Sequence, residues 1–316
     1  MHVFSIPLTT RFRRIDVREG VLLRGPAGWA EFSPFADYDD VESAAWLRAA
    51  LEAAREGHPP AVRDRIPVNV TVPAVDGSRA HAIVRASGGC TTAKVKVAEP
   101  GQSEAQEIER LEAVRDALGP QGRIRIDANG GWDVATALAR LAVLDRAAGG
   151  LEYVEQPCAS VEDLAAVRRR TDVLVAADES IRRAEDPFEV VRREAADVVV
   201  LKVQPLGGAR ACLRLAEELG LPVVVSSAVE TSVGLRAGVA LAAALPGLDR
   251  ACGLETGRLL AGDVVVDPLV PVDGALAVRD VAPDPTLLAR HRADADLTRW
   301  WLDRMERTRR IVEEQE

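Results

Sequence analysis

The sequence predicts an α/β fold: a parallel barrel of alternating strands and helices, with a smaller α+β capping domain beside it. Two observations support the barrel. From about residue 66 to residue 255, short Val/Ile-rich runs alternate with amphipathic segments rich in Ala, Arg and Leu, which is the pattern of repeated βα units. In addition, charged residues end five consecutive runs, whereas an open doubly wound sheet would concentrate its site residues at one switch point.

Eight strands are expected in the barrel, each a short apolar run rich in β-branched residues. They lie at 68–72, 93–97, 124–127, 153–155, 174–178, 198–203, 223–226 and 251–254. Helical segments between them include 132–147, 161–170, 208–219 and 233–245. The barrel is expected to span residues 66–262 and to carry the active site at the carboxyl ends of its strands.

The regions before and after the barrel lack this rhythm. Residues 1–65 are expected to form the N-terminal part of the capping domain. The elements expected there are short strands at 14–23 and 28–32 and a helix at about 41–56, with Asp39 or Asp40 as its N-cap.

Residues 263–316 are expected to pack back on the cap. Asp273-Gly274 predicts a hairpin turn between strands at 269–272 and 275–278. A charged helix is expected after the hairpin, with Trp300 and Trp301 packed on another element.

Composition narrows the class of protein. The chain has 316 residues, of which 47% are hydrophobic and 28% charged, and its net charge of −9 argues against nucleic acid or an anionic membrane as its partner. No leader-like or 18-residue apolar run is present, and the four scattered cysteines form no CxxC pair. We therefore expect a cytoplasmic protein with no obligate protein partner.

The charged strand ends are the most informative feature. Lys94 and Lys96 occur in AKVKV, and the later ends are Asp127 in RIRIDAN, Glu155 in YVEQP, Asp178 in VAADES and Lys202 in VVVLKVQ. A charge at the end of a buried strand is costly unless it is paired or binds a metal. The pattern therefore indicates a catalytic site at the barrel mouth.

The three acids predict a metal site. Carboxylate oxygens without sulfur or imidazole suit a hard divalent cation, so Mg²⁺ is expected at Asp127, Glu155 and Asp178, with Mn²⁺ as a substitute. Helix N-caps would explain one such acid, but three on adjacent strands are harder to explain in that way. Together with charged Lys94 and Lys202, the site should favour a small anionic carboxylate substrate.

The lysines predict proton transfer. Lys94 and Lys96 are two residues apart, so they point to the same face of their strand. An isolated pair of this kind is usually solvated, but the neighbouring acids favour a site in which Lys96 is the base and Lys202 lies on the opposite side. The inferred step is proton abstraction α to a carboxylate.

These residues resemble the muconate-lactonizing subgroup of the enolase superfamily, and RIDANGGW, YVEQP, QPLGG and SSAVETSVG are most similar to the o-succinylbenzoate synthases. The resemblance implies a modified TIM-type (β/α)7β barrel and a Mg²⁺-dependent lyase of menaquinone biosynthesis. Lys96 would be the acid/base group, and Lys202 would stabilise the enediolate or act as the opposite acid/base group. The implied reaction is a syn dehydration of a succinyl hydroxycyclohexadiene carboxylate.

Several neighbours are expected to support the site. Arg125 and Asn129 share a face with Asp127 and would contact the substrate, position the ligands or only pack. Ser226 and Ser227 would bind the succinyl carboxylate. The pair Gly207-Gly208 would let backbone approach an anion or form an ordinary turn. The aromatic residues of one short segment are expected to form either a lid or a small cap core: Trp29, Phe32, Phe35 and Tyr38.

Two alternatives to the synthase remain. An N-succinylamino acid racemase needs nearly the same residues and would use both lysines for proton transfer. A dipeptide epimerase is disfavoured, because Gly253-Leu254-Glu255-Thr256 lacks the paired aspartates of that family. The second alternative is a non-catalytic metal-binding or scaffold barrel, which would be expected to lose at least one charged strand end.

Overall fold

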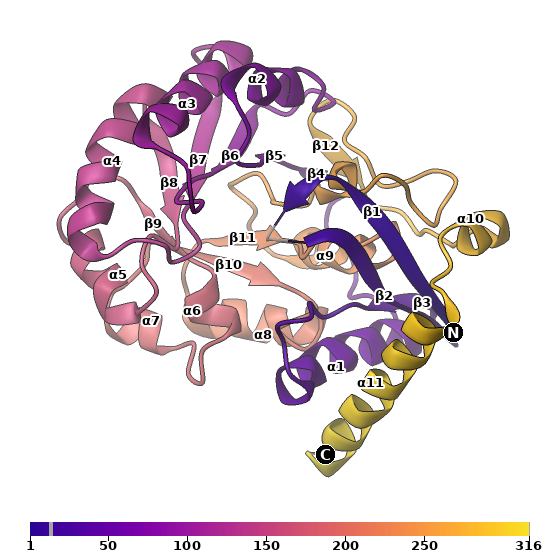
Figure 1. Cartoon of the computed structure of the whole chain (residues 1–316). Helices are drawn as coiled ribbons and strands as arrows, with labels where there is room; N and C mark the ends of the chain where they lie inside the picture. Colours follow the sequence, from indigo (N-terminus) through magenta and orange to yellow (C-terminus); the bar gives the residue numbers. More distant parts are fainter. Residues whose placement is uncertain (13–14, 316) are drawn as a thin grey trace.

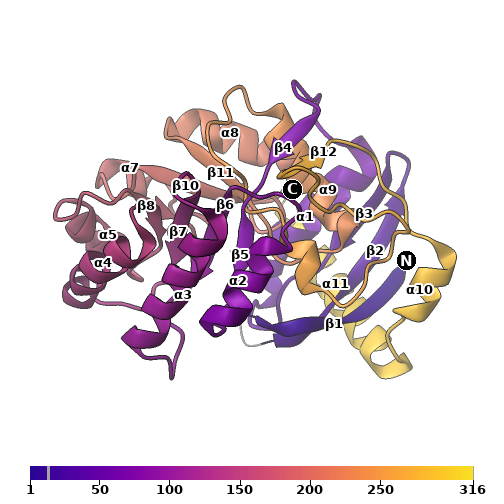
Figure 2. The same ribbon diagram turned by 90° about the horizontal axis from the view of Figure 1, so that it is seen from above.

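The computed structural model describes residues 1–12 and 15–315. A seven-stranded parallel sheet curls into a barrel with helices outside it (Figure 1 and Figure 2). Neighbouring strands follow chain order, so each βα unit lies beside the next. The strands are β5 (Val70–Val72), β6 (Thr92–Lys96), β7 (Arg123–Asp127), β8 (Leu151–Glu155), β9 (Val175–Ala177), β10 (Val198–Lys202) and β11 (Val223–Ser226).

The ring closes through the segment predicted as the eighth strand. Single parallel bridges join Ser226 to Gly253 and Val68 to Cys252. The Gly253 amide donates to the carbonyl of Val225 at 2.8 Å. A Cβ at Gly253 would lie 2.6 Å from Ser226 Oγ, so this close approach requires glycine. The eighth strand is thus present as two bridges rather than as a full ladder.

The helices cover the outer face of the barrel strands, and none in residues 1–12 and 15–315 combines the length and apolarity needed to cross a bilayer. The four predicted helical segments are confirmed, and side chains cap several helices, including Ser103, Asp133, Ser160 and Thr231. The helices are α2 (Gly77–Arg85), α3 (Glu104–Leu118), α4 (Val134–Ala148), α5 (Val161–Arg168), α6 (Glu179–Arg182), α7 (Glu189–Arg192), α8 (Ala209–Leu219) and α9 (Ser232–Ala244).

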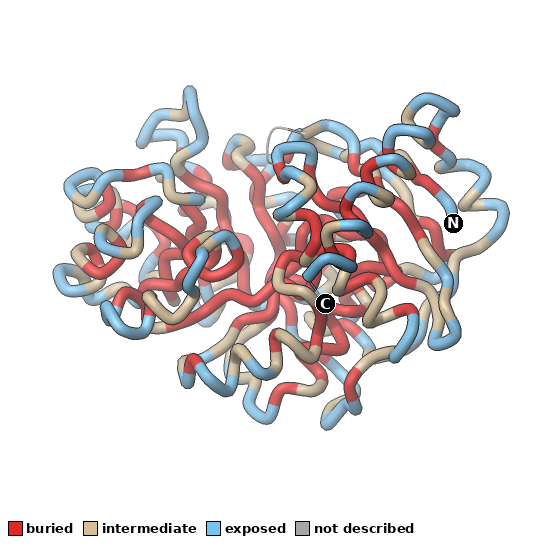
Figure 3. Tube along the Cα trace, turned by 90° about the horizontal axis from the view of Figure 1, so that it is seen from below, coloured by how far each residue is buried: buried red, intermediate tan, exposed pale blue. Residues whose placement is uncertain are grey.

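Strand alternation separates the core from the site. Val95, Ile126 and Val154 belong to the large core under the helices, whereas Tyr153 and Val200 belong to a smaller cluster inside the ring. Side chains two residues apart on a strand share a face, so Lys94 and Lys96 both point inward. Figure 3 shows the buried strands in red and the exposed outer turns in pale blue.

The capping domain begins with an antiparallel sheet in the order β1 (His2–Phe12), β2 (Ile15–Gly25), β3 (Gly28–Phe32). The strand predicted at 14–23 corresponds to β2, and residue 14 lies outside the described residues. The predictions missed β1. The predicted cap helix is confirmed as α1 (Asp40–Glu56), whose N-cap is Asp39 in a capping box with Glu42.

The C-terminal region differs from its prediction in two respects. The turn at Asp273-Gly274 is present, but β12 (Ala275–Ala277) pairs with β4 (Arg65–Pro67), because Leu276 is fully buried opposite Ile66. Between the barrel and β12, residues Thr256–Leu259 form one turn of 3-10 helix, η1.

Instead of one charged helix there are two, α10 (Pro285–Arg290) and α11 (Ala295–Glu314). Trp301 packs edge-on against Phe32 in the cap core, with ring centroids 6.1 Å apart. Trp300 remains 43% exposed. Of the two predicted packing tryptophans, only Trp301 is therefore buried.

Candidate active site

The strand register gathers the charged residues at one end of the barrel. Lys96 on β6 lies directly opposite Asp127 on β7, and Asp127 lies opposite Glu155 on β8. Lys202 ends β10 beside Ser226 on β11. These carboxyl ends surround a small central cavity that Lys94, Lys96, Asp127, Asn129, Lys202 and Ser226 help to line.

Lys94 and Lys96 are held by carboxylates. Lys94 Nζ donates to Glu155 Oε1 at 2.8 Å and Oε2 at 3.0 Å, and it lies 3.3 Å from Asp127 Oδ2. Lys96 Nζ donates to Asp127 Oδ2 at 2.5 Å and to Asn129 Oδ1 at 2.7 Å. Both amines therefore have fixed positions on one wall of the cavity.

Asp178 anchors the opposite wall. Lys202 Nζ donates to Asp178 Oδ2 at 2.5 Å, and Arg182 Nε donates to Asp178 Oδ1 at 2.9 Å. Arg182 lies on α6, one turn after Asp178, so the local helix brings it back to the strand end. The predictions missed Arg182, although the i, i+4 spacing in DESIR is a signal that could have identified it.

Burial and charge shift the pKa values of this cluster in different directions. For Asp127, burial acts to raise the pKa, but the ammonium groups of Lys96 and Lys94 outweigh it and hold the pKa below its usual range. Burial and the Asp127 carboxylate raise the pKa of Glu155 to about 7. Burial lowers the pKa of Lys202. Lys202 is therefore easier to deprotonate than an ordinary lysine.

The surroundings of Lys94 favour its protonated form, and those of Asp178 favour its deprotonated form. Burial acts to lower the pKa of Lys94, but the carboxylates of Glu155 and Asp127 raise it above its usual range. For Asp178, the effect of burial is outweighed by Arg182 and Lys202, which hold the pKa below its usual range.

The three predicted metal ligands fit a hard cation by donor type. In the part of the chain that the structure describes, no three acidic, His or Cys side chains surround a common cation position. The three carboxylates form ion pairs with lysines: Asp127 with Lys96, Glu155 with Lys94 and Asp178 with Lys202. The donors are nevertheless three buried carboxylates on consecutive strands, which is the oxygen set that Mg²⁺ takes.

Arg125 lies below the cavity rather than in it. Its side chain is fully buried and donates to Glu152 Oε2 at 2.5 Å, to Asn69 Oδ1 at 3.1 Å and to the carbonyl of Ala251 at 2.7 Å. These bonds tie β7 to the segments on both sides of the ring closure. Its contacts are those of a supporting residue and not of a substrate contact.

Ser226 and Ser227 line the cavity, but their hydroxyl groups donate hydrogen bonds to a backbone carbonyl of the protein. Ser227 Oγ donates to the carbonyl of Gly253 at 2.8 Å and lies 2.7 Å from Thr256 Oγ1, and Ser226 Oγ donates to the same carbonyl at 3.3 Å. Their hydroxyl protons are therefore engaged, which weakens the prediction that they bind a carboxylate.

The backbone at Gly207-Gly208 approaches an anion of the protein itself. Gly208 precedes α8, and a Cβ there would lie 2.7 Å from Glu52 Oε2. The Glu52 carboxylate accepts from the amides of Ala209 and Arg210. The anion that this backbone approaches is thus a carboxylate of the cap helix.

Of the two expectations for the aromatic segment, a lid or a small cap core, the cap core is the one observed for three of its four residues, and Trp29 packs against a different cluster. Phe32, Phe35 and Tyr38 are buried in one cluster with Trp46 and Trp301. The aromatic side chain at the cavity is instead Phe12, whose ring centroid lies 5.4 Å from Lys96 Nζ. Sequence reasoning missed Phe12 because it missed β1.

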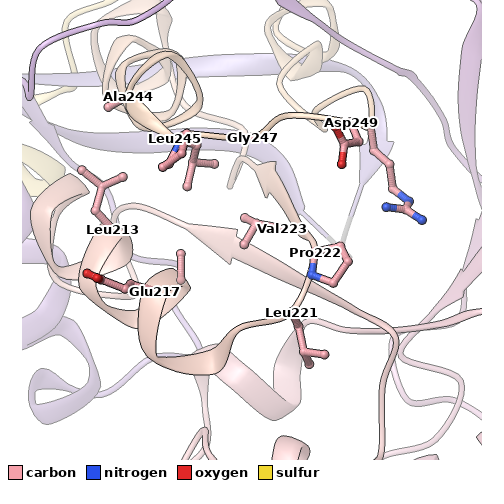
Figure 4. A pocket seen from close by; sticks show the side chains of 12 residues that line it. Leu213, Glu217, Leu221, Pro222, Val223, Ala244, Leu245, Gly247 and Asp249 are labelled. Carbon is pink, nitrogen blue, oxygen red and sulfur yellow. The ribbon is translucent and has the colours of Figure 1, made fainter.

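A larger cavity of about 520 Å³ lies at the other end of β11, between α8 and the loop after α9 (Figure 4). Leu213, Leu221, Val223 and Leu245 line much of it. None of the charged strand ends contributes to it. The chemistry of the side chains, and not cavity size, therefore identifies the barrel mouth as the site.

Comparison with known proteins agrees with this geometry. The family model described as enolase C-terminal domain-like matches residues 77–283, and the enolase N-terminal domain-like model matches residues 3–54. The o-succinylbenzoate synthase of Thermobifida fusca is 67% identical over 92% of this chain and 91% of that protein. The o-succinylbenzoate synthase of Mycolicibacterium smegmatis is 53% identical over 96% of this chain and 94% of that protein.

A solved structure supports the architecture. Muconate lactonizing enzyme from Pseudomonas fluorescens aligns with a TM-score of 0.79 and 22% identity, covering 92% of this chain and 97% of that one. Such a distant likeness shows the fold alone, a barrel with an N-terminal cap, as the sequence predicted. The family matches and the close relatives go further: the chain is an enzyme that belongs to the o-succinylbenzoate synthases of the enolase superfamily.

Proposed function

We propose that the chain catalyses the Mg²⁺-dependent syn dehydration of 2-succinyl-6-hydroxy-2,4-cyclohexadiene-1-carboxylate to o-succinylbenzoate. This is a carbon–oxygen lyase reaction of menaquinone biosynthesis. The observation that carries the proposal is that Lys96 and Lys202 lie on opposite walls of one cavity, each paired with a buried strand-end carboxylate, Asp127 and Asp178 respectively. The names of the close synthase relatives support o-succinylbenzoate as the product.

Asp127, Glu155 and Asp178 would hold Mg²⁺, and Mn²⁺ would serve as a substitute. When bound, the cation supplies positive charge that makes the α-proton of the substrate carboxylate more acidic and disfavours a charged ammonium beside it. Lys94 contributes a further positive charge to the site, held between the Glu155 and Asp127 carboxylates. The site as a whole then attracts a dianionic substrate.

Lys96 is the proton-transfer residue in this proposal. Its amine, placed by Asp127 and Asn129, takes the proton from the carbon α to the carboxylate. The electron pair of that C–H bond first delocalises into the substrate carboxylate, and it then forms the new ring double bond as the neighbouring C–O bond breaks. The Lys96 ammonium returns its proton to the departing hydroxide, so one water leaves and the ring becomes aromatic. A single base suffices because hydrogen and hydroxyl leave from the same face.

Lys202 acts from the opposite wall. As an ammonium it stabilises the negative charge that develops on the substrate carboxylate when the proton departs. Its bond to Asp178 keeps the amine directed into the cavity. Phe12 packs beside Lys96 and excludes water from the proton-transfer face.

N-succinylamino acid racemisation is the second candidate function. It requires a proton to leave one face of the substrate and return to the other, so both lysines must exchange protons. The observation that favours this candidate is that Lys96 and Lys202 line one cavity from opposite walls, so an amine faces each side of a bound substrate.

We also infer a cytoplasmic enzyme that acts without an obligate protein partner. For the compartment, the support is that Cys90, Cys158, Cys212 and Cys252 are buried free thiols, as in proteins of reducing compartments.

The experiment that tests the proposed function supplies purified protein with the diene carboxylate and Mg²⁺ and follows formation of the aromatic product by ultraviolet absorbance. Turnover with saturation kinetics is expected. Absence of product with folded, metal-supplied protein would contradict the proposal.

A further inference from the structure

One guanidinium connects the two sides of the site to the capping domain. The side chain of Arg182 is 1% exposed, and its Nε donates to Asp178 Oδ1 at 2.9 Å. Its two other nitrogens donate to Glu179 Oε1 and to the hydroxyl of Tyr38, which belongs to the cap. Arg182 thus joins a strand-end acid, the first residue of α6 and the capping domain.

Hydrogen bonds continue from Arg182 to both lysines. On one side, Asp178 Oδ2 accepts from Lys202 Nζ at 2.5 Å. On the other side, Glu179 Oε1 accepts from Asn129 Nδ2 at 3.3 Å, and Asn129 Oδ1 accepts from Lys96 Nζ at 2.7 Å. An unbroken series of contacts therefore runs from Lys202 to Lys96 across the mouth, with Arg182 at its centre.

Tyr38, the capping-domain residue that contacts Arg182, is held in place by packing. Tyr38 is buried, and its ring packs against Trp46 at 5.4 Å and Phe35 at 6.4 Å between centroids. A shift of the cap would therefore move the Tyr38 hydroxyl and the guanidinium that it contacts.

We propose that Arg182 is a positioning residue for the reaction: it holds Asp178 directly and Lys96 through Glu179 and Asn129, and Tyr38 couples this arrangement to the seating of the cap. The inference rests on the proposed function for the roles of Asp178 and Lys96. Groups that orient a ligating carboxylate typically contribute 10- to 100-fold to metal affinity or activity. Arg182 should therefore affect turnover without contacting the substrate.

The neighbouring arginine provides a matched control. Arg183 also joins the barrel to the cap, with Nη2 at 2.8 Å from Glu42 Oε1 and its guanidinium 4.6 Å from the Tyr38 ring centroid. Its ion pairs are with Asp37 and Glu42, both of the cap, and not with a strand-end acid. Arg183→Met therefore weakens the cap contact while leaving the series between the lysines intact.

The experiment compares Arg182→Met, Arg182→Lys, Tyr38→Phe and Arg183→Met with the parent protein. The melting temperature reports folding, electron paramagnetic resonance of added Mn²⁺ reports metal affinity without substrate, and steady-state kinetics separates kcat from KM. Arg182→Met should weaken Mn²⁺ binding and lower kcat roughly 10- to 100-fold. Arg182→Lys should recover part of both, because it keeps the charge but not the fork that reaches three partners.

Tyr38→Phe removes one hydroxyl and keeps the ring packing. It should lower kcat by roughly 2- to 10-fold, the size of one net hydrogen bond, with KM unchanged. Arg183→Met should keep kcat and Mn²⁺ affinity within about twofold of the parent.

Arg182→Met with parental Mn²⁺ affinity and parental kcat would overturn the proposal, as would equal losses in Arg182→Met and Arg183→Met. If Arg182→Met does not fold, Arg182→Lys provides the test instead. A kcat and a Mn²⁺ affinity equal to those of the parent in Arg182→Lys would show that the guanidinium group is not needed, and would overturn the proposal. A parental kcat in Tyr38→Phe would remove the coupling to the cap. Absence of dehydration by the parent would refute the proposed function, while the Mn²⁺ measurement would still report on Arg182.

Discussion

Lys96 Nζ lies 2.5 Å from Asp127 Oδ2, and the two residues are direct partners in the parallel pairing of β6 with β7. Residues that end successive parallel strands meet at one edge by the geometry of the sheet. This contact therefore follows from the βα spacing of the chain. It joins a proposed proton-transfer residue to a proposed metal ligand, and the Lys96 ammonium helps to hold the pKa of Asp127 below its usual range.

Metal removal should abolish activity. Protein treated with a chelator is expected to lose turnover and to regain it with Mg²⁺, because the substrate carboxylate then has its neutralising cation. Asp178→Asn should lose metal binding and activity but keep its melting temperature within a few degrees. Full turnover by rigorously metal-free protein would exclude the proposed mechanism.

Each lysine should be needed for turnover. Lys96→Ala should lower kcat by at least roughly 10²- to 10⁴-fold, the usual loss when a general base is removed. Lys202→Ala should be comparably impaired through loss of charge stabilisation at the carboxylate. Circular dichroism provides the folding control. Rates near those of the parent in either variant would mean that the residue has been assigned the wrong role.

The two adjacent tryptophans should differ in their effect on stability. Trp301 is 3% exposed in the cap core, so Trp301→Ala should cost about 3–5 kcal/mol of unfolding free energy. Trp300 is 43% exposed, so Trp300→Ala should cost well under half of that. Urea denaturation of the two variants makes the comparison. Equal losses would show that the burial difference does not govern their contribution.

The buried cap carboxylate Glu31 should make stability depend on pH. Burial raises the pKa of Glu31 to about 7, although Arg18 acts against the shift. Because the folded-state pKa lies above the ordinary value, the stabilisation is present at low pH and is lost as pH rises through about 7. Glu31→Gln, which resembles the protonated acid, should gain stability relative to the parent between pH 5 and pH 8. A stability difference that is constant over this range would contradict the assignment.

The barrel and the position of the site could be predicted because they depend on local pattern. The charges of Asp127, Glu155 and Asp178 lie at the ends of apolar runs whose spacing matches βα units, and the sheet brings them together. The pairing of Lys94 with Glu155 could not be predicted in the same way, since it depends on how far the lysine side chain reaches past β7 to β8.

Contacts made through the cap were the least predictable. Phe12 reaches the cavity from β1, more than 80 residues before Lys96, and no local pattern relates the two. The expected hairpin is limited to one antiparallel bridge between Val272 and Ala275, and the ladder of β12 forms instead with β4, where Leu276 is buried opposite Ile66. Long-range packing of this kind carries no periodic signal in the chain.

The most direct test of the central claim compares dehydration and racemisation on one preparation of the protein. The measurement is kcat/KM for the succinyl hydroxycyclohexadiene carboxylate and for N-succinylamino acids, with α-deuterium exchange in D₂O as the readout of the second reaction. We predict a kcat/KM for dehydration of roughly 10⁴–10⁸ M⁻¹s⁻¹, the ordinary enzymatic range, and at most slow deuterium exchange. Racemisation faster than dehydration by about tenfold or more would contradict the synthase assignment and favour the racemase.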